Sequence, residues 1–177
     1  MRKVILLIIL LILTLTFTSC SNGGTGMGVF GDNDEEFADK TFNEIITAIR
    51  LQDDSKIVDM FSNSIKSEDN LSQSALKFFG FIHGDIVAFS SASEAGVGTD
   101  YRIESGKKRK EIQSAFCIST TENTYYIAIK ECIKDEFDDN NIGIMSIYII
   151  ESNNWTENYV YRGDGKWIPG INIVDSF

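Results

Sequence analysis

The predicted fold rests mainly on two neighbouring stretches of the chain. Residues 112–120 read IQSAFCIST and residues 125–133 read YYIAIKECI, with the four residues TENT between them. Alternating stretches rich in Ile, Phe and Tyr are typical of strands, and a short polar link between them indicates a hairpin. An even register pairs apolar side chains along one face, which we expect to be the core: Ile112 with Ile133, Phe116 with Ile129, Ile118 with Ile127, and Thr120 with Tyr125.

The same register pairs two polar residues on the core face, Ser114 and Glu131. A carboxyl group directed at an apolar concavity loses contact with water, which raises its pKa, and it can then act as an acid, a base or a ligand anchor. The alternative is a bulge or a frayed end of the sheet that turns Glu131 to solvent. Glu131 and Ser114 are therefore candidate pocket residues.

The hairpin also separates two of the three cysteines. Cys117 and Cys132 fall on the face opposite to the core, and their offset along the strands is ~13 Å at the rise of a strand. A disulfide needs Cα atoms within about 7 Å, so we predict two free thiols. No nearby His or Cys completes a metal site, and we predict neither a metal nor another cofactor.

Helical periodicity dominates the chain before the hairpin. Apolar residues recur at three- and four-residue steps over residues 34–51, with acidic residues in the first turn, and this pattern predicts an amphipathic helix. Asp53-Asp54 begins a second, shorter helix, for which Asn63 is the expected stop. A third helix is predicted to begin at Ser67 and to end at Gly80.

Strand patterns occupy the rest of the chain. A first strand is predicted around residues 86–89, a loop of small residues over 90–99, and a central strand over 142–150, which is apolar on both faces. A last hairpin is predicted from residues 159–161 and 166–174, across an Asp-Gly turn. Three helices followed by mainly antiparallel strands indicate the α+β class, with the helices packed on one face of a curved sheet.

The N-terminus predicts export. Arg2-Lys3 is a short basic start, and the apolar run over residues 4–17 is too short to span a bilayer, as in a signal peptide. Phe17-Thr18-Ser19-Cys20 resembles the lipobox of bacterial lipoproteins, although leucine is usual where Phe17 stands. In such proteins the cysteine receives diacylglycerol, whose two acyl chains give stable anchoring, and the peptide is cut before it. An ordinary secretory signal with an incidental cysteine is the alternative.

These features divide the chain into three parts. We expect a signal peptide over residues 1–19, a lipidated glycine-rich tether over 20–34 and one α+β domain over 35–177. The expected location is the extracytoplasmic face of the cell membrane, held by lipid on Cys20.

The net charge of the chain limits its partners. It is −10 overall, and it becomes −12 once Arg2 and Lys3 leave with the leader. So acidic a surface repels phosphate backbones and anionic headgroups, so we expect no nucleic acid partner and no attachment to the membrane by a basic face. The basic cluster at residues 107–110 is interpreted as a solvated hairpin end.

Two further groups of residues invite a functional interpretation. His83 is the only histidine and stands two residues before Asp85, so the pair is a candidate for general base chemistry. A structural histidine at a helix-to-strand turn is the alternative, and no Ser or Cys motif nearby indicates a nucleophile. The acidic residues 135–141 lack the spacing of an EF-hand loop and are interpreted as a solvated loop.

Several short phrases resemble known families. Residues 42–49 (FNEIITAI), the acidic turn at 53–54 and residues 59–62 (DMFS) are similar to the opening helices of the nuclear-transport-factor-two-like superfamily. Residues 78–82 (FFGFI), 143–147 (GIMSI) and 169–171 (PGI) are similar to uncharacterised lipoproteins of low-GC Gram-positive bacteria. The resemblance implies a cone-shaped α+β fold that often encloses a pocket, which enzymes such as ketosteroid isomerase line with polar residues. None of their catalytic residues matches a position here, so no catalytic residue is assigned.

The leading hypothesis for function is a non-catalytic surface domain that binds a small ligand or a protein partner outside the cell. The alternative is a hydrolase or isomerase that uses Glu131, together with His83. An enclosed polar pocket reached by Glu131 and Ser114 would favour a ligand binder or enzyme. An exposed apolar sheet face would favour a protein-interaction module or a homodimer.

Overall fold

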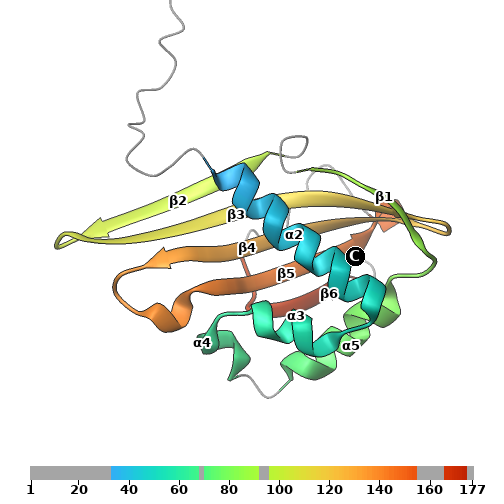
Figure 1. Ribbon diagram of the computed structural model, residues 1–177, viewed down its shortest axis with the longest axis horizontal. Helices are drawn as coiled ribbons and strands as arrows, with labels where there is room; N and C mark the ends of the chain where they lie inside the picture. Colours follow the sequence, from blue (N-terminus) through green and yellow to red (C-terminus); the bar gives the residue numbers. More distant parts are fainter. Residues whose placement is uncertain (1–32, 68–69, 92–95, 155–165, 175–177) are drawn as a thin grey trace, which may run out of the picture. The chain divides into compact units, whose positions relative to one another are not determined.

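Helices precede strands in the part of the chain that the structure describes. The computed structural model describes residues 33–67, 70–91, 96–154 and 166–174. Cys20 and the predicted leader lie outside the described residues. The described helices are α2 (Asp34–Leu51), α3 (Asp54–Met60), α4 (Asn63–Lys66) and α5 (Leu71–Phe81) (Figure 1). None of them is long and apolar enough to cross a membrane.

The strands form one curved, open and mainly antiparallel sheet, which confirms the α+β class. They are β1 (Ile86–Phe89), β2 (Val97–Glu104), β3 (Lys107–Thr120), β4 (Thr124–Asp135), β5 (Gly143–Glu151) and β6 (Gly170–Val174). The order across the sheet is β1-β3-β4-β5-β6, and β2 also pairs with β3. Short 3-10 turns at Asp139–Asn141 and Ser152–Asn154 flank β5.

The long helix α2 lies across one face of the sheet, as Figure 1 shows. Its predicted range, residues 34–51, is confirmed, and it ends where Gln52 adopts a left-handed conformation with φ 53°. The Phe42 ring stacks on Phe116 of β3, with ring centroids 3.9 Å apart and planes 8° apart. This contact holds the apolar side of α2 on the middle of the sheet.

The helices after α2 differ from the prediction. The predicted second helix begins at Asp54 as α3, and Asp53 caps it by accepting a bond from the Lys56 amide (3.0 Å). Asn63 begins α4 rather than ending a helix, because the extended Ser62 donates its amide to the Ile144 carbonyl of β5 (2.9 Å) and interrupts the helical run. α5 continues through Gly80 to Phe81, whereas the pattern predicted that it would begin at Ser67 and stop at Gly80.

The predicted hairpin of β3 and β4 has the right faces but a register that is wrong by two residues. Ile118 pairs with Tyr125 and Phe116 pairs with Ile127. The shift arises at the turn, where the Thr120 amide bonds to the Asn123 carbonyl (2.8 Å) and closes the hairpin on two residues. A shift of two residues preserves the side-chain alternation, so the predicted core face is confirmed.

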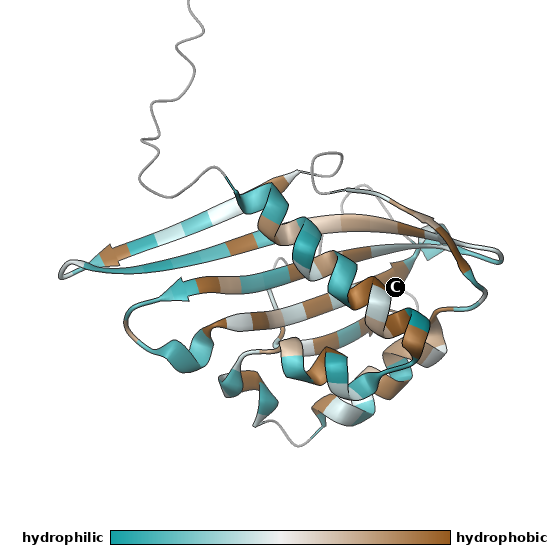
Figure 2. Cartoon of the chain, in the orientation of Figure 1, coloured by the Kyte–Doolittle hydropathy of each residue, from teal (hydrophilic) through white to brown (hydrophobic). Residues whose placement is uncertain are grey.

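The strand β2 is absent from the prediction, which placed a loop over residues 90–99. It pairs with the first half of β3 across a turn at Ser105 and Gly106, whose φ angles of 51° and 81° are those of a type I′ turn. The basic cluster at residues 107–110 does begin at this hairpin end, but Lys110 is buried. Figure 2 shows that the β2–β3 end of the sheet is mainly hydrophilic.

Of the predicted last hairpin, only the second strand lies within the described residues, where residues 170–174 form β6; its first strand, residues 159–161, lies outside them. β6 runs parallel to β5, with Ile147 beside Ile171, and residues 155–165, which include the predicted Asp-Gly turn, lie outside the described residues. Trp167 lies on the face of the sheet opposite to α2, where its ring meets Tyr148 at a centroid distance of 5.7 Å. The described residues that lead into β6 therefore lie on that face. The prediction that residues 142–150 form a central strand is confirmed, because β5 lies between β4 and β6.

Candidate functional site

The strand β4 places Glu131 beneath α2. Its neighbours across the sheet are Ile112 of β3 and Ile144 of β5. The β4–β5 ladder shifts register between Lys130 and Glu131, yet Glu131 is only 3% exposed. The irregularity therefore does not turn the carboxyl group to solvent, and the alternative interpretation of a solvated side chain is wrong.

The helix α2 supplies the hydrogen-bond donor of this site. The Thr41 hydroxyl donates to Glu131 Oε2 at 2.9 Å, and Thr41 is itself buried. The neighbouring stack of Phe42 on Phe116 fixes the height and rotation of the helix at this point. The other carboxyl oxygen of Glu131, Oε1, is buried and has no hydrogen-bond partner among the described residues.

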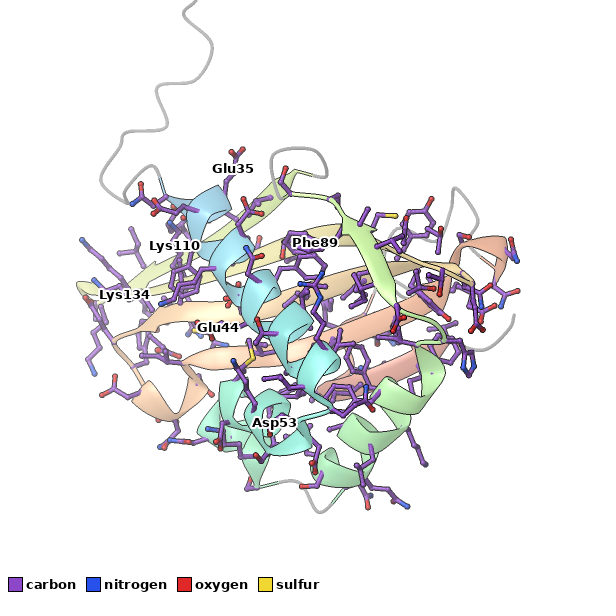
Figure 3. The ribbon with its side chains drawn as sticks, turned by 45° about the vertical axis from the view of Figure 1, so that its right-hand side comes forward. Glu35, Glu44, Asp53, Phe89, Lys110 and Lys134 are labelled. Atoms are coloured by element: carbon purple, nitrogen blue, oxygen red, sulfur yellow. The ribbon has the colours of Figure 1, made fainter. Side chains whose placement is uncertain are left out.

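Burial changes the protonation of this carboxyl group. The loss of water raises the pKa of Glu131 to about 8; the Thr41 hydroxyl opposes that rise, and the nearby charge of Glu44 adds to it. Glu44 projects from α2 (Figure 3), one turn along from Thr41. At neutral pH Glu131 is therefore mostly a neutral acid, which can both donate and accept a hydrogen bond.

Ser114 of β3 lies near Glu131 but not opposite to it. Its partners across the sheet are Val97 of β2 and Ile129 of β4, so the predicted Ser114–Glu131 pair is wrong by the register shift. The two residues are instead diagonal neighbours on the same face, at a spacing on the order of 7–8 Å. Ser114 is 1% exposed, and its Oγ also has no partner among the described residues.

The three buried residues Thr41, Ser114 and Glu131 form one polar group in an otherwise apolar layer, and we call it the Glu131 cluster. Buried polar atoms in folded proteins nearly always have a partner, so two orphaned atoms in one place require an explanation. Together they offer a hydroxyl and a neutral acid to a small polar group. That arrangement can orient a ligand, and the acid could also donate a proton to it.

His83 does not join this site. It is exposed at the turn between α5 and β1, where its amide donates to the Tyr125 hydroxyl (2.9 Å) and its carbonyl accepts from Thr120 (2.6 Å). Thr120 lies eight residues along β3 from Ile112, the neighbour of Glu131, which is on the order of 26 Å at the rise of a strand. The predicted cooperation of His83 with Glu131 is therefore wrong.

The cysteines and the acidic loop lie outside the Glu131 cluster. Cys117 and Cys132 are free thiols, as predicted, and burial raises the pKa of each. Cys117 pairs with Tyr126 across the hairpin. The Asp135 carboxylate accepts bonds from the amides of Phe137 (2.8 Å) and Asp138 (3.2 Å), so it organises its own loop. No group of three or more metal-binding side chains occurs among the described residues.

Thr41 and Glu44 belong to the site but were not among the residues predicted for it. Thr41 stands beside Ala38, Phe42 and Ile45 on the buried side of α2, so a single polar residue in that apolar stripe was the available signal. Glu44 is half-buried and acts only through its charge.

Two surface clefts lie elsewhere and contain none of the candidate residues. One, of about 530 Å³, lies between α5 and β6, and one of about 220 Å³ lies on the β2–β3 hairpin. The Glu131 cluster is therefore separate from both clefts.

The fold and the site define an α+β domain with a buried acid beneath its long helix. Residues 44–152 match the family described as a domain of unknown function (DUF5104), and this match covers more than half of the chain. The chain therefore belongs to the DUF5104 family. The matched region contains Glu131 and Ser114, whereas Thr41 precedes it. No curated protein matches the sequence.

Proposed function

We propose that this protein is a lipid-anchored, extracytoplasmic binding domain without catalytic activity, and that its ligand is a small polar molecule held at the Glu131 cluster. The observation that carries this proposal is the pair of buried, unpartnered atoms, Glu131 Oε1 and Ser114 Oγ. A ligand with a hydroxyl or carbonyl group would satisfy both. The α2 helix covers the cluster and would keep water from competing for these bonds.

The proposed location rests on the sequence around Cys20. The basic start, the short apolar run and the small residues before the cysteine support cleavage there and lipid attachment to its thiol. The glycine-rich residues after it would hold the domain near the membrane without contact with its surface. The net charge of −10 supports the same arrangement, because anionic headgroups repel an acidic domain.

We also propose that the fold is of the cone-shaped, nuclear-transport-factor-two-like type. Its support is the order of the elements, with helices first, a long helix across a curved sheet, and polar side chains between them. Membership of this fold type would explain a ligand site on the covered face of the sheet. It would not name the ligand.

The second candidate function is a hydrolase or isomerase in which Glu131 is the general acid. A carboxyl group with a pKa of about 8 holds a proton at neutral pH, as a general acid must. The distance of His83 from the cluster weighs against this candidate, because it removes the predicted base. We therefore place ligand binding first.

Mass spectrometry of the full-length protein, isolated from the membranes of cells that encode it, tests the proposal. We expect the wild type to carry a small molecule that is released on denaturation. The variants Glu131→Gln and Ser114→Ala should no longer carry it, and Glu122→Gln should still carry it. Glu122 is exposed at the β3–β4 turn and is a matched control for the loss of a charge. Equal retention by Glu131→Gln and the wild type would contradict the proposal. A molecule converted by the wild type and intact on Glu131→Gln would favour the enzyme.

A further inference from the structure

One edge of β2 lies on β3, and the backbone groups of β3 show which residues of β2 face the other way. The Lys108 amide donates to Glu136 Oε2 (2.8 Å), and the Lys108 carbonyl accepts from the Glu136 amide (2.9 Å). Both backbone groups of Lys108 are therefore directed at the β4 side of the strand. Because backbone groups of alternate residues point to opposite edges, those of Lys107 and Arg109 point towards β2.

The outward edge of β2 follows from this alternation. Glu104 pairs with Lys107 and Arg102 pairs with Arg109, so the backbone groups of Glu104 and Arg102 point towards β3. Those of Thr99, Tyr101 and Ile103 consequently point away from the sheet. Among the described residues, β3 is the only strand that pairs with β2. An edge of this kind presents a row of donors and acceptors to another strand.

We propose that β2 pairs antiparallel with β2 of a second copy of this chain, about a twofold axis at Tyr101, so that the two sheets become one. In this register Thr99 of each copy lies opposite Ile103 of the other, and the outward backbone groups meet as hydrogen-bonded pairs. Both strands then overlap over nearly their full length. A twofold contact of this kind is the commonest way in which identical chains associate.

The charges of β2 select this register over its neighbours. With Tyr101 on the axis, Asp100 of each copy lies directly opposite Arg102 of the other, which stabilises an antiparallel pair. A register in which Tyr101 of one copy lies opposite Thr99 of the other places Asp100 opposite Asp100, and the two negative charges repel each other. A register in which Tyr101 lies opposite Ile103 of the other copy places Arg102 opposite Arg102 and Asp100 opposite Glu104, so like charges again face each other. Larger slips leave part of each strand unpaired.

The two faces of β2 suit the same arrangement. On the α2 side, Ile103 is 62% exposed and Tyr101 is 47% exposed, and a paired strand would cover part of both. The Tyr101 ring already lies near the Lys110 ammonium group (5.2 Å), and the contact with a second copy leaves that interaction in place. On the other face, Arg102 bonds to Glu104 in an exposed ion pair (2.5 Å), which Asp100 of the second copy would join.

An eight-residue edge makes a small interface, so we expect a transient contact that is best detected by covalent trapping. In the proposed register, Cys residues at position 101 have Cα atoms ~5.5 Å apart, within the range of a disulfide. Cys residues at position 99 or at position 103 lie ~13 Å or more from their own copies and cannot bond.

The test uses full-length Tyr101→Cys, Thr99→Cys and Ile103→Cys in membranes of the expressing cells, under mild oxidation, with the wild type as the background for the native cysteines. We expect the disulfide-linked dimer of Tyr101→Cys to exceed that of either control roughly tenfold, because only its thiols meet. In the Tyr101→Cys background, Asp100→Arg should abolish the dimer, and the double change Asp100→Arg with Arg102→Asp should restore it. The proposal would be overturned if the three single variants cross-linked equally. It would also be overturned if Asp100→Arg left the yield of the Tyr101→Cys dimer unchanged.

Discussion

Glu131 lies between Ile112 and Ile144 on the face of the sheet that α2 covers, and this position determines its protonation. Ionisation of a carboxyl group away from water is unfavourable unless enough donors compensate it. Thr41 is the one donor that bonds to Glu131 among the described residues, and the negative charge of Glu44 is unfavourable as well. The raised pKa is the sum of these three influences.

The stability of the protein should therefore depend on pH through Glu131. Its pKa is about 8 in the folded chain against 4.5 for an unperturbed glutamate, so the folded state keeps a proton that the unfolded state has lost between these values. The free energy of unfolding contributed by this group is complete below about pH 4.5 and is lost as the pH rises to about 8, by at most on the order of 5 kcal/mol. Denaturant unfolding across this range measures the loss.

The variant Glu131→Gln isolates this effect, because an amide is neutral at every pH. We expect the difference in unfolding free energy between Glu131→Gln and the wild type to grow with pH in favour of the variant. The exposed Glu122→Gln change should leave the wild-type profile unaltered. Parallel pH profiles for the wild type and Glu131→Gln would show that Glu131 has the same pKa in the folded and unfolded chains.

Residues that share a strand could be assigned from the sequence, and residues that meet through tertiary packing could not. The alternation along β3 and β4 placed Ser114 and Glu131 on the core face, and the structure confirms this. The contact of Thr41 with Glu131 depends on how α2 is rotated over the sheet, which no local pattern encodes. For His83 the sequence was misleading. Its neighbour Asp85 suggested a general base, whereas in the structure the His83 backbone amide bonds to the Tyr125 hydroxyl at a turn.

Among the elements, α2 is attached to the sheet at its N-terminal end by an ion pair between a buried lysine and a half-buried aspartate. Lys110 of β3 reaches Asp34 in the first turn of α2, and it is only 5% exposed (Figure 3). Burial lowers the pKa of Lys110, but its interactions with Asp34 and Tyr101 outweigh that effect and leave the pKa raised. Thr99 of β2 bonds to the same carboxylate at 2.9 Å.

Loss of this ion pair should loosen the start of the helix that covers the Glu131 cluster. We expect Lys110→Met to increase hydrogen exchange in the first two turns of α2, because it leaves Asp34 without its buried cation. Lys77→Met, a change of an exposed lysine on α5, is the matched control and should leave α2 unchanged. Unaltered exchange at α2 in Lys110→Met would show that the ion pair does not hold the helix.

The close approach of β5 to the end of α3 depends on a glycine. Gly143 has φ 125°, and a Cβ there would lie 2.8 Å from the Ser62 amide nitrogen. We expect Gly143→Ala to lower the free energy of unfolding by about 2–4 kcal/mol, because strain and a backbone clash add together. Gly80→Ala, at a helical site with nothing within 4 Å, should instead raise it by up to ~1 kcal/mol. Thermal unfolding of both variants measures the contrast, and equal effects would contradict it.

Elements with strong periodicity were predictable, and elements defined by their pairing were not. The range of α2 follows from its apolar stripe and its acidic first turn. β2 was not predicted because it is mostly exposed and none of its residues is fully buried in the core. The parallel pairing of β6 with β5 was not predicted, because strand order and direction are properties of the topology and not of the local sequence.

For the whole molecule, the acidic charge and the N-terminal sequence both support a location near a membrane. The domain would be held near a membrane by lipid on Cys20, and neither nucleic acid nor anionic lipid would attract its surface. The partners that this leaves open are a small ligand and another protein. A second copy of the chain is the protein partner that the edge of β2 fits.

Lipid attachment should depend on Cys20 alone. We expect the wild type to incorporate a radiolabelled lipid precursor and to sediment with membranes, because two acyl chains give stable anchoring. Cys20→Ser should lose both properties, and Cys117→Ser should keep both. Release of unlabelled wild-type protein into the medium would contradict lipid anchoring.

The central claim is that Glu131 is a buried acid that stays protonated at neutral pH, ready to bind a polar ligand. Titration of its side-chain carboxyl carbon by NMR, assigned by its loss in Glu131→Gln, tests this claim most directly. We predict an apparent pKa of about 8. A value near 4.5, the value of an exposed glutamate, would contradict the claim.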